Sequence, residues 1–95
     1  MNNINHNEMK TLVVFAIEHT LLQISNVTLE KVEKKIRDEC NCTLSECYVH
    51  PEYLNKVLKD LFGKSYLEIV KSIHKYLDDF TYQESIALFL KKISE

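Results

Sequence analysis

Cys40-Asn41-Cys42-Thr43-Leu44-Ser45-Glu46-Cys47-Tyr48-Val49-His50-Pro51 is the stretch that decides the fold, and it holds all three cysteines and the only proline of the 95 residues. Proline suits the first position of a helix, because the amide hydrogen that it lacks would be unpaired there anyway. Asparagine tolerates the left-handed conformation that often ends a helix. The stretch therefore predicts a junction: one helix ends near Cys40–Asn41, and the next begins at Pro51 with His50 as its N-cap.

Apolar residues recur at steps of three and four on both sides of this junction, which is the spacing of amphipathic helices. Ser25 and Thr28 can cap the helix that ends near Cys40. Gly63 can stop the helix that begins at Pro51. Thr81 and Glu84 have the spacing of a capping box, which predicts another helix start. We expect helices over residues 8–23, 25–40, 51–62, 64–77 and from 81 onward.

The composition agrees with a helical protein. One glycine and one proline are too few for a turn-rich β domain, and 45% hydrophobic residues argue against intrinsic disorder. Residues 1–7 are polar, rich in asparagine and without periodicity, so they predict a disordered N-terminal tail. We therefore expect an all-α protein, a compact single-domain bundle of about five short helices over residues 8–95.

The sequence carries no sign of export or of membrane insertion. It shows no secretory signal, and no stretch approaches the ~18 consecutive apolar residues of a transmembrane helix. Three cysteines, an odd number, fit a reducing compartment better than a secreted disulfide framework. We expect a cytoplasmic protein that has no membrane partner.

The cysteines and His50 are the candidates for chemistry, because thiolate and imidazole are the usual zinc ligands. Cys40, Cys42, Cys47 and His50 lie close together in sequence. Their spacing is not that of a C-x2-C pair and no second cluster follows, so we favour buried thiols, which are common for free cysteine. A Cys42–Cys47 disulfide is a further alternative. A metal- or redox-responsive domain that uses Cys42, Cys47 and His50 stays one hypothesis for the function.

Other functional classes are disfavoured. A single glycine excludes a glycine-rich phosphate loop, and no nucleophile stands with a general base, so we expect neither an enzyme nor a cofactor. Twelve basic and fourteen acidic residues are interspersed and give a formal charge of −2, which disfavours nucleic acid as a partner. The alternative is a DNA-binding regulator with a helix-turn-helix-like pair around Gly63, in which Lys64, Lys71 and Lys75 would reach phosphates.

The first predicted helix is apolar around much of its circumference. Its apolar positions at helical spacing are Leu12, Phe15, Ala16, His19 and Leu22, and Val13, Ile17 and Leu21 widen the surface. A small bundle has little room to cover so broad a surface. We therefore expect Leu12, Phe15, His19 and Leu22 to contact a partner protein or a second copy of the chain.

The junction and the helix after it resemble a known family. The residues Asn41-Cys42-x-Leu44-x-x-Cys47-Tyr48-x-His50-Pro51-Glu52-Tyr53-Leu54, followed by Val57-Leu58-Lys59-x-Leu61-Phe62-Gly63, are similar to the Nitrosopumilus output domain family. The similarity covers most of residues 25–94. It implies a small helical domain of archaea, found alone or attached to signalling modules, with no assigned catalytic residues. Cys42, Cys47, His50 and Pro51 would then be a shared structural signature.

These observations together predict a non-enzymatic helical module for protein interaction or signal output in archaeal signalling or regulation. The module would form a homodimer or dock on a partner protein. The DNA-binding regulator and the metal- or redox-responsive domain are the two alternatives.

Overall fold

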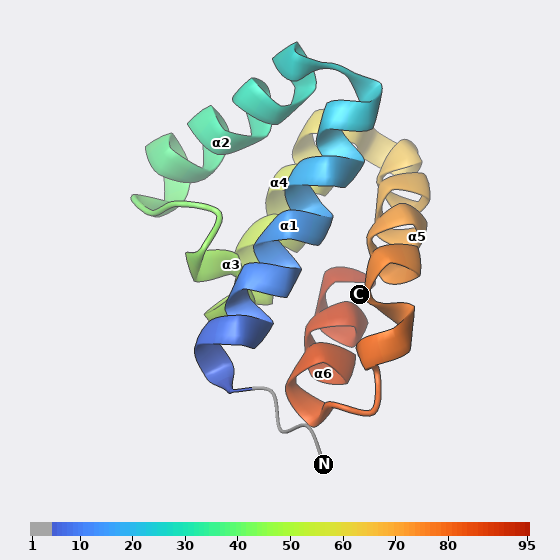
Figure 1. Ribbon diagram of the computed structural model, residues 1–95. Helices are drawn as coiled ribbons and strands as arrows, with labels where there is room; N and C mark the ends of the chain where they lie inside the picture. Colours follow the sequence, from blue (N-terminus) through green and yellow to red (C-terminus); the bar gives the residue numbers. More distant parts are fainter. Residues whose placement is uncertain (1–4) are drawn as a thin grey trace.

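The computed structural model describes residues 5–95, and within them the chain is all-α, as predicted (Figure 1). Five helices correspond to the predicted ones, and a sixth, a single turn inside the junction, was not predicted. The helices are α1 (His6–Ile24), α2 (Asn26–Cys40), α3 (Glu46–Val49), α4 (Pro51–Phe62), α5 (Tyr66–Leu77) and α6 (Glu84–Ile93). Two short 3-10 turns, η1 (Gly63–Ser65) and η2 (Asp78–Phe80), precede and follow α5.

The helices form a bundle with α1 at its centre, flanked by α2 on one side and α5 on the other (Figure 1). Behind α1 lies α4, which packs against α2 and α6, and α6 also contacts α5. The radius of gyration of the Cα atoms is 12.5 Å, close to the ~13 Å expected of a compact domain of about 100 residues. Within residues 5–95, no helix is both long enough and apolar enough to cross a membrane.

One face of every long helix supplies the core. Leu54 and Leu58 of α4 are fully buried, and each buried side chain of this size contributes roughly 1.5–3 kcal/mol. On α1 the buried face is Val13, Ala16, Ile17 and Leu21. The largest fully buried side chains are Val13, Ile17, Leu21, Val32, Ile36, Leu54, Leu58, Ile73, Leu77, Ile86, Phe89 and Ile93.

Helix α1 begins at His6, two residues before its predicted start. Asn5 is its N-cap: the side-chain oxygen accepts the amide hydrogen of Glu8 at 2.8 Å, and the side-chain amide donates to the Glu8 carboxylate at 2.9 Å. This reciprocal pair is a capping interaction, which satisfies backbone donors that a helix start leaves free. The predicted tail boundary at residue 7 is therefore wrong, because residues 5–7 belong to the helix start. Residues 1–4 of that predicted tail lie outside the described residues.

Most predicted helix ends are confirmed. The Ser25 hydroxyl accepts the Thr28 amide at 3.0 Å and caps α2, and Asn41 ends α2 in the left-handed region with φ 54° and ψ 42°. Pro51 is the first residue of α4. Gly63 ends α4 with φ 55° and ψ −134°, a conformation that glycine alone adopts at low cost.

Two details of the predicted helix starts are wrong. The capping box at Thr81 does not form, because the Thr81 hydroxyl donates to the Asp78 carbonyl within the preceding turn, at 3.0 Å. Helix α6 starts at Glu84 instead, with Gln83 as the N-cap residue. His50 is the N-cap residue of α4 as predicted, but its side chain makes no capping hydrogen bond.

Candidate interaction surfaces

Four residues on the outer side of α1, Leu12, Phe15, His19 and Leu22, form what we call the α1 stripe. Phe15 is 48% exposed and Leu22 is 43% exposed, while Leu12 is half-buried. The core-facing side of the same helix is already filled by Val13, Ala16, Ile17 and Leu21. The α1 stripe is therefore a largely apolar surface that the bundle itself covers only in part.

Aromatic contacts hold the middle of the α1 stripe in place. The Phe15 ring stacks on the His19 ring with 4.0 Å between centroids. Tyr76 of α5 lies edge-on to Phe15 at 6.3 Å and is 5.9 Å from His19. Pairs of aromatic rings in such geometries contribute about 0.5–1.5 kcal/mol beyond the area that they bury. These contacts restrict the side chains of an exposed surface before any partner arrives, which lowers the entropy cost of binding.

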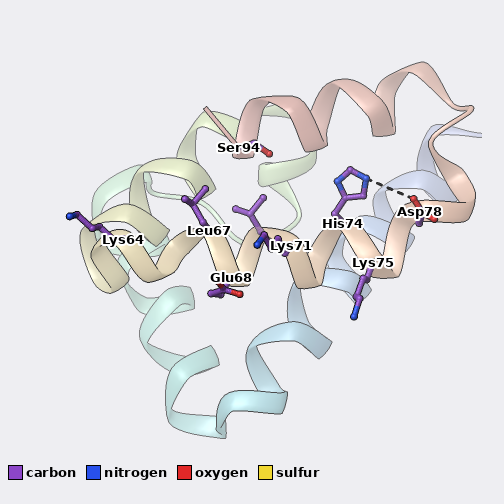
Figure 2. Close-up of a pocket in the computed structure, with 9 residues that line it drawn as sticks. Lys64, Leu67, Glu68, Lys71, His74, Lys75, Asp78 and Ser94 are labelled. Atoms are coloured by element: carbon purple, nitrogen blue, oxygen red, sulfur yellow. Dashed lines mark ion pairs between the residues drawn. The ribbon is translucent and has the colours of Figure 1, made fainter.

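A second surface lies between α5 and α6, and we call it the α5–α6 groove. It is a hollow of about 700 Å³ whose lining includes Leu67, Val70 and His74 of α5, together with Ser94. Leu67 and His74 extend from α5 towards α6, whereas Glu68 extends to the opposite side of α5 (Figure 2). A smaller hollow of about 360 Å³ shares the lining residues His74 and Ser94, so the two are neighbours.

The far wall of the α5–α6 groove is fixed by hydrogen bonds. The Ser94 carbonyl accepts the Tyr66 hydroxyl at 3.3 Å, and the Asn55 amide of α4 donates to the Ile93 carbonyl at 2.9 Å. Lys59 of α4 donates to the Glu95 carbonyl at 2.9 Å. The carbonyls of the last turn of a helix have no partner within the helix. Here the side chains of Asn55, Lys59 and Tyr66 donate hydrogen bonds to the carbonyls of residues 93–95. The hollow therefore lies between two anchored helices.

Lysines surround the α5–α6 groove. Lys64, Lys71 and Lys75 border the larger hollow and Lys91 borders the smaller one. Within residues 5–95, none of these four lysines forms an ion pair with another described side chain. The groove also has two carboxylates, Glu68 and Asp78, and Asp78 lies 3.9 Å from the His74 ring nitrogen.

The lysines of α2 and α4 behave differently, because they form a network with carboxylates. Glu39 of α2 is bound by Lys35 and, at 2.7 Å, by Lys56 of α4. Asp60 lies 3.6 Å from Lys56 and 3.9 Å from Lys35. Hydrogen bonds from the two lysines lower the pKa of Glu39, and the Glu39 carboxylate raises the pKa of Lys56.

The cysteine junction is arranged as buried or half-buried free thiols. Cys47 on α3 is fully buried, which confirms the prediction for this residue, and burial raises its pKa to about 12. Cys40 and Cys42 are only half-buried, so the prediction of a buried thiol is wrong for these two residues. Partial burial, and after it the neighbouring Cys40, raises the pKa of Cys42. All three cysteines are free, so the alternative Cys42–Cys47 disulfide is not formed. A raised pKa keeps a thiol protonated and therefore unreactive.

His50 contacts two residues of α4. Its Nδ1 lies 3.2 Å from the Glu52 carboxylate, and its ring stacks on Tyr53 with 4.7 Å between centroids. In the part of the chain that the structure describes, no three His, Cys, Asp or Glu side chains are grouped so that they could hold a metal ion. The candidate ligands Cys40, Cys42, Cys47 and His50 are thus close in sequence without being assembled into a site.

Comparisons with protein-family models, with curated proteins and with solved structures give no match. The resemblance to the output-domain family therefore stays a prediction. Sequence reasoning identified the α1 stripe and three of the groove lysines. It missed the α5–α6 groove as a surface, although Leu67, Lys71 and His74 recur at steps of four and three on one side of α5.

Proposed function

We propose that this protein is a non-enzymatic helical interaction module that associates with a second copy of itself through the α1 stripe. From the resemblance to the output-domain family, we propose archaeal signalling or regulation in the cytoplasm as its setting. The observation that supports the proposal is the exposure of Phe15 and Leu22 on a helix whose opposite face already fills the core.

The order of residues in the α1 stripe favours a second copy as the partner. Leu12, Phe15, His19 and Leu22 follow steps of three, four and three, which is the spacing of a coiled-coil seam over two heptads. The pattern is also symmetric about its centre. If two α1 helices pack antiparallel around a two-fold axis, Leu12 lies opposite Leu22 of the partner copy and Phe15 lies opposite its His19. A two-fold interface requires this kind of self-complementary surface.

The interface is small, so we expect a weak dimer with a dissociation constant in the micromolar range, roughly 10–100 μM. Sedimentation equilibrium over a wide range of protein concentrations measures it directly. Phe15→Asp and Leu22→Asp each place a charge in the seam and should shift the protein to monomer. Leu88→Asp is the matched control, because Leu88 is 52% exposed on α6 and lies outside the stripe.

The circular dichroism of each variant should match that of the parent, because none of the three residues is buried in the core. A parent protein that sediments as a monomer at about 1 mM contradicts self-association. A dimer that Leu88→Asp disrupts as strongly as Phe15→Asp places the interface elsewhere and also contradicts the proposal.

A further inference from the structure

The α5–α6 groove has an apolar floor that is long enough for a short peptide. Val70 of α5 lines the larger hollow and Leu90 of α6 lines the smaller one, with 5% and 3% of their surfaces exposed. Leu67 at one end is 48% exposed and offers an uncovered apolar side chain. Helix α5 spans 12 residues, which corresponds to roughly 18 Å at the rise of an α-helix. Three turns of a partner helix would fit along it.

The charge around this floor is opposite in sign to the charge of the whole protein. Four lysines (Lys64, Lys71, Lys75 and Lys91) and two carboxylates (Glu68 and Asp78) line the two hollows, which leaves a formal charge of +2 with neutral histidine. Lys75 and Glu68 extend to the far side of α5 (Figure 2), and because their charges cancel, the charge is +2 without them as well. The whole chain carries −2. Because the four lysines have no ion-pair partner among residues 5–95, their charges are available to a ligand. Such a surface attracts anionic partners and selects against cationic ones.

The combination of an apolar floor and a basic rim distinguishes between anionic partners. Nucleic acid binds chiefly through its charged phosphate backbone. Leu67, which is 48% exposed, would gain nothing from a phosphate. A partner helix with an apolar face and acidic flanks matches both properties, as in the general mode in which an amphipathic helix lies in an apolar groove.

We propose that the α5–α6 groove binds an acidic amphipathic helix of a partner protein. Two or three apolar side chains of that helix pack on Leu67, Val70 and Leu90. Its carboxylates pair with Lys71 on the α5 side and with Lys91 on the α6 side. This surface is separate from the α1 stripe, so self-association and binding of a partner helix occur at different places on the molecule.

The test uses a fluorescent synthetic peptide of about three to four turns, with leucines at helical i, i+3, i+4, i+7 spacing and glutamates at the remaining positions. Fluorescence anisotropy measures its binding to the full chain. We expect micromolar binding, weakened at least tenfold by Lys71→Glu combined with Lys91→Glu, and weakened similarly by Leu67→Asp. Lys31→Glu, at an exposed position of α2, is the control for a charge change outside the groove. It should leave the dissociation constant of the peptide within about twofold.

Three comparisons decide the proposal. A peptide of the same composition in scrambled order should bind at least tenfold more weakly; equal binding would show charge attraction alone and overturn the proposal. Absence of peptide binding at about 1 mM overturns it as well. A DNA duplex that binds more tightly than the peptide, and loses binding in the Lys71→Glu, Lys91→Glu variant, would assign the groove to nucleic acid instead. The Phe15→Asp variant should still bind the peptide, because Phe15 lies outside the α5–α6 groove. Peptide binding by this variant therefore tests the groove independently of self-association.

Discussion

The α2–α4 side of the molecule and the α5–α6 groove contain the same kinds of residue in opposite arrangements. On the α2–α4 side, Lys35 and Lys56 are paired with Glu39 and Asp60 across the two helices. Around the α5–α6 groove, Lys71 and its neighbouring lysines lack partners within the described chain and surround uncovered apolar surface. Overall charge and lysine content therefore say little about binding; the placement of carboxylates relative to the lysines matters more.

The same contrast extends to the apolar residues. Leu54 and Leu58 of α4 are fully buried, whereas Leu67 of α5 is 48% exposed and lines the groove. One side thus serves stability and the other is free for recognition. Three predictions test this division, beginning with the largest expected effect.

A matched pair of leucine substitutions tests the division most strongly. Leu58→Ala on α4 should lower the free energy of unfolding by about 2–5 kcal/mol, because it removes buried methyl groups and leaves a cavity. Leu67→Ala on α5 should change it by no more than about 0.5 kcal/mol, as is usual for an exposed residue. Urea denaturation followed by circular dichroism measures both. Similar losses in the two variants would show that α5 is as much a part of the core as α4.

The buried thiol beside α4 should make the stability depend on alkaline pH. The folded protein holds the Cys47 proton with a pKa of about 12, above the ordinary value of 9.0, so the stabilisation is complete below pH 9 and is lost as the pH rises towards 12. We expect a loss of about 1 kcal/mol by about pH 10. Urea midpoints as a function of pH measure it.

Cys47→Ala should remove this part of the alkaline slope, although other groups still titrate in the same range. Cys40→Ala is the control, because Cys40 is only half-buried and the slope should persist in that variant. An identical slope in Cys47→Ala and in the parent would mean that the thiol is not shielded from water in solution.

The smallest effect concerns the ion pairs. Glu39→Gln should lower the thermal midpoint slightly, because the Glu39 carboxylate accepts hydrogen bonds from two lysines. Since the pKa of Glu39 is lowered from 4.5, this contribution is present above about pH 4.5 and is lost as the pH falls through the folded-state pKa. Lys71→Gln should leave the midpoint unchanged. Added salt should reduce the effect of Glu39→Gln, and a larger effect of Lys71→Gln would reverse the comparison.

The helices could be predicted because their signals are local. Pro51 and Gly63 mark the two ends of α4 through their own backbone preferences, and Asn41 ends α2 for the same reason. Thr81 misled the prediction because its hydroxyl has two possible backbone partners. The hydroxyl donates to the carbonyl of Asp78, three residues earlier, and does not accept an amide hydrogen from the start of α6. The sequence alone does not determine which of these two hydrogen bonds forms.

The candidate surfaces were only partly predictable, because exposure depends on packing: the sequence predicted the α1 stripe and did not predict the α5–α6 groove. On α1 both Val13 and Phe15 belong to apolar sets at helical spacing, and only the positions of α2 and α5 decide which of them is buried. At the junction, the unpredicted turn α3 carries Cys47 into the core and leaves Cys42 half-exposed. The α5–α6 groove requires two helices from different parts of the chain, so no single stretch of sequence describes it.

The contact between α1 and α5 has a consequence for how the protein is made. Phe15 of α1 contacts Tyr76 of α5. Roughly fifty residues separate the end of α1 from Tyr76, and their synthesis takes about 3–10 s at ordinary ribosome speeds. During this time the side of α1 that contacts α5 has no partner within the chain, whereas α2 is synthesised directly after α1 and can already pack on it. The α1–α5 contact is therefore the later of the two long contacts of α1 to become possible during synthesis.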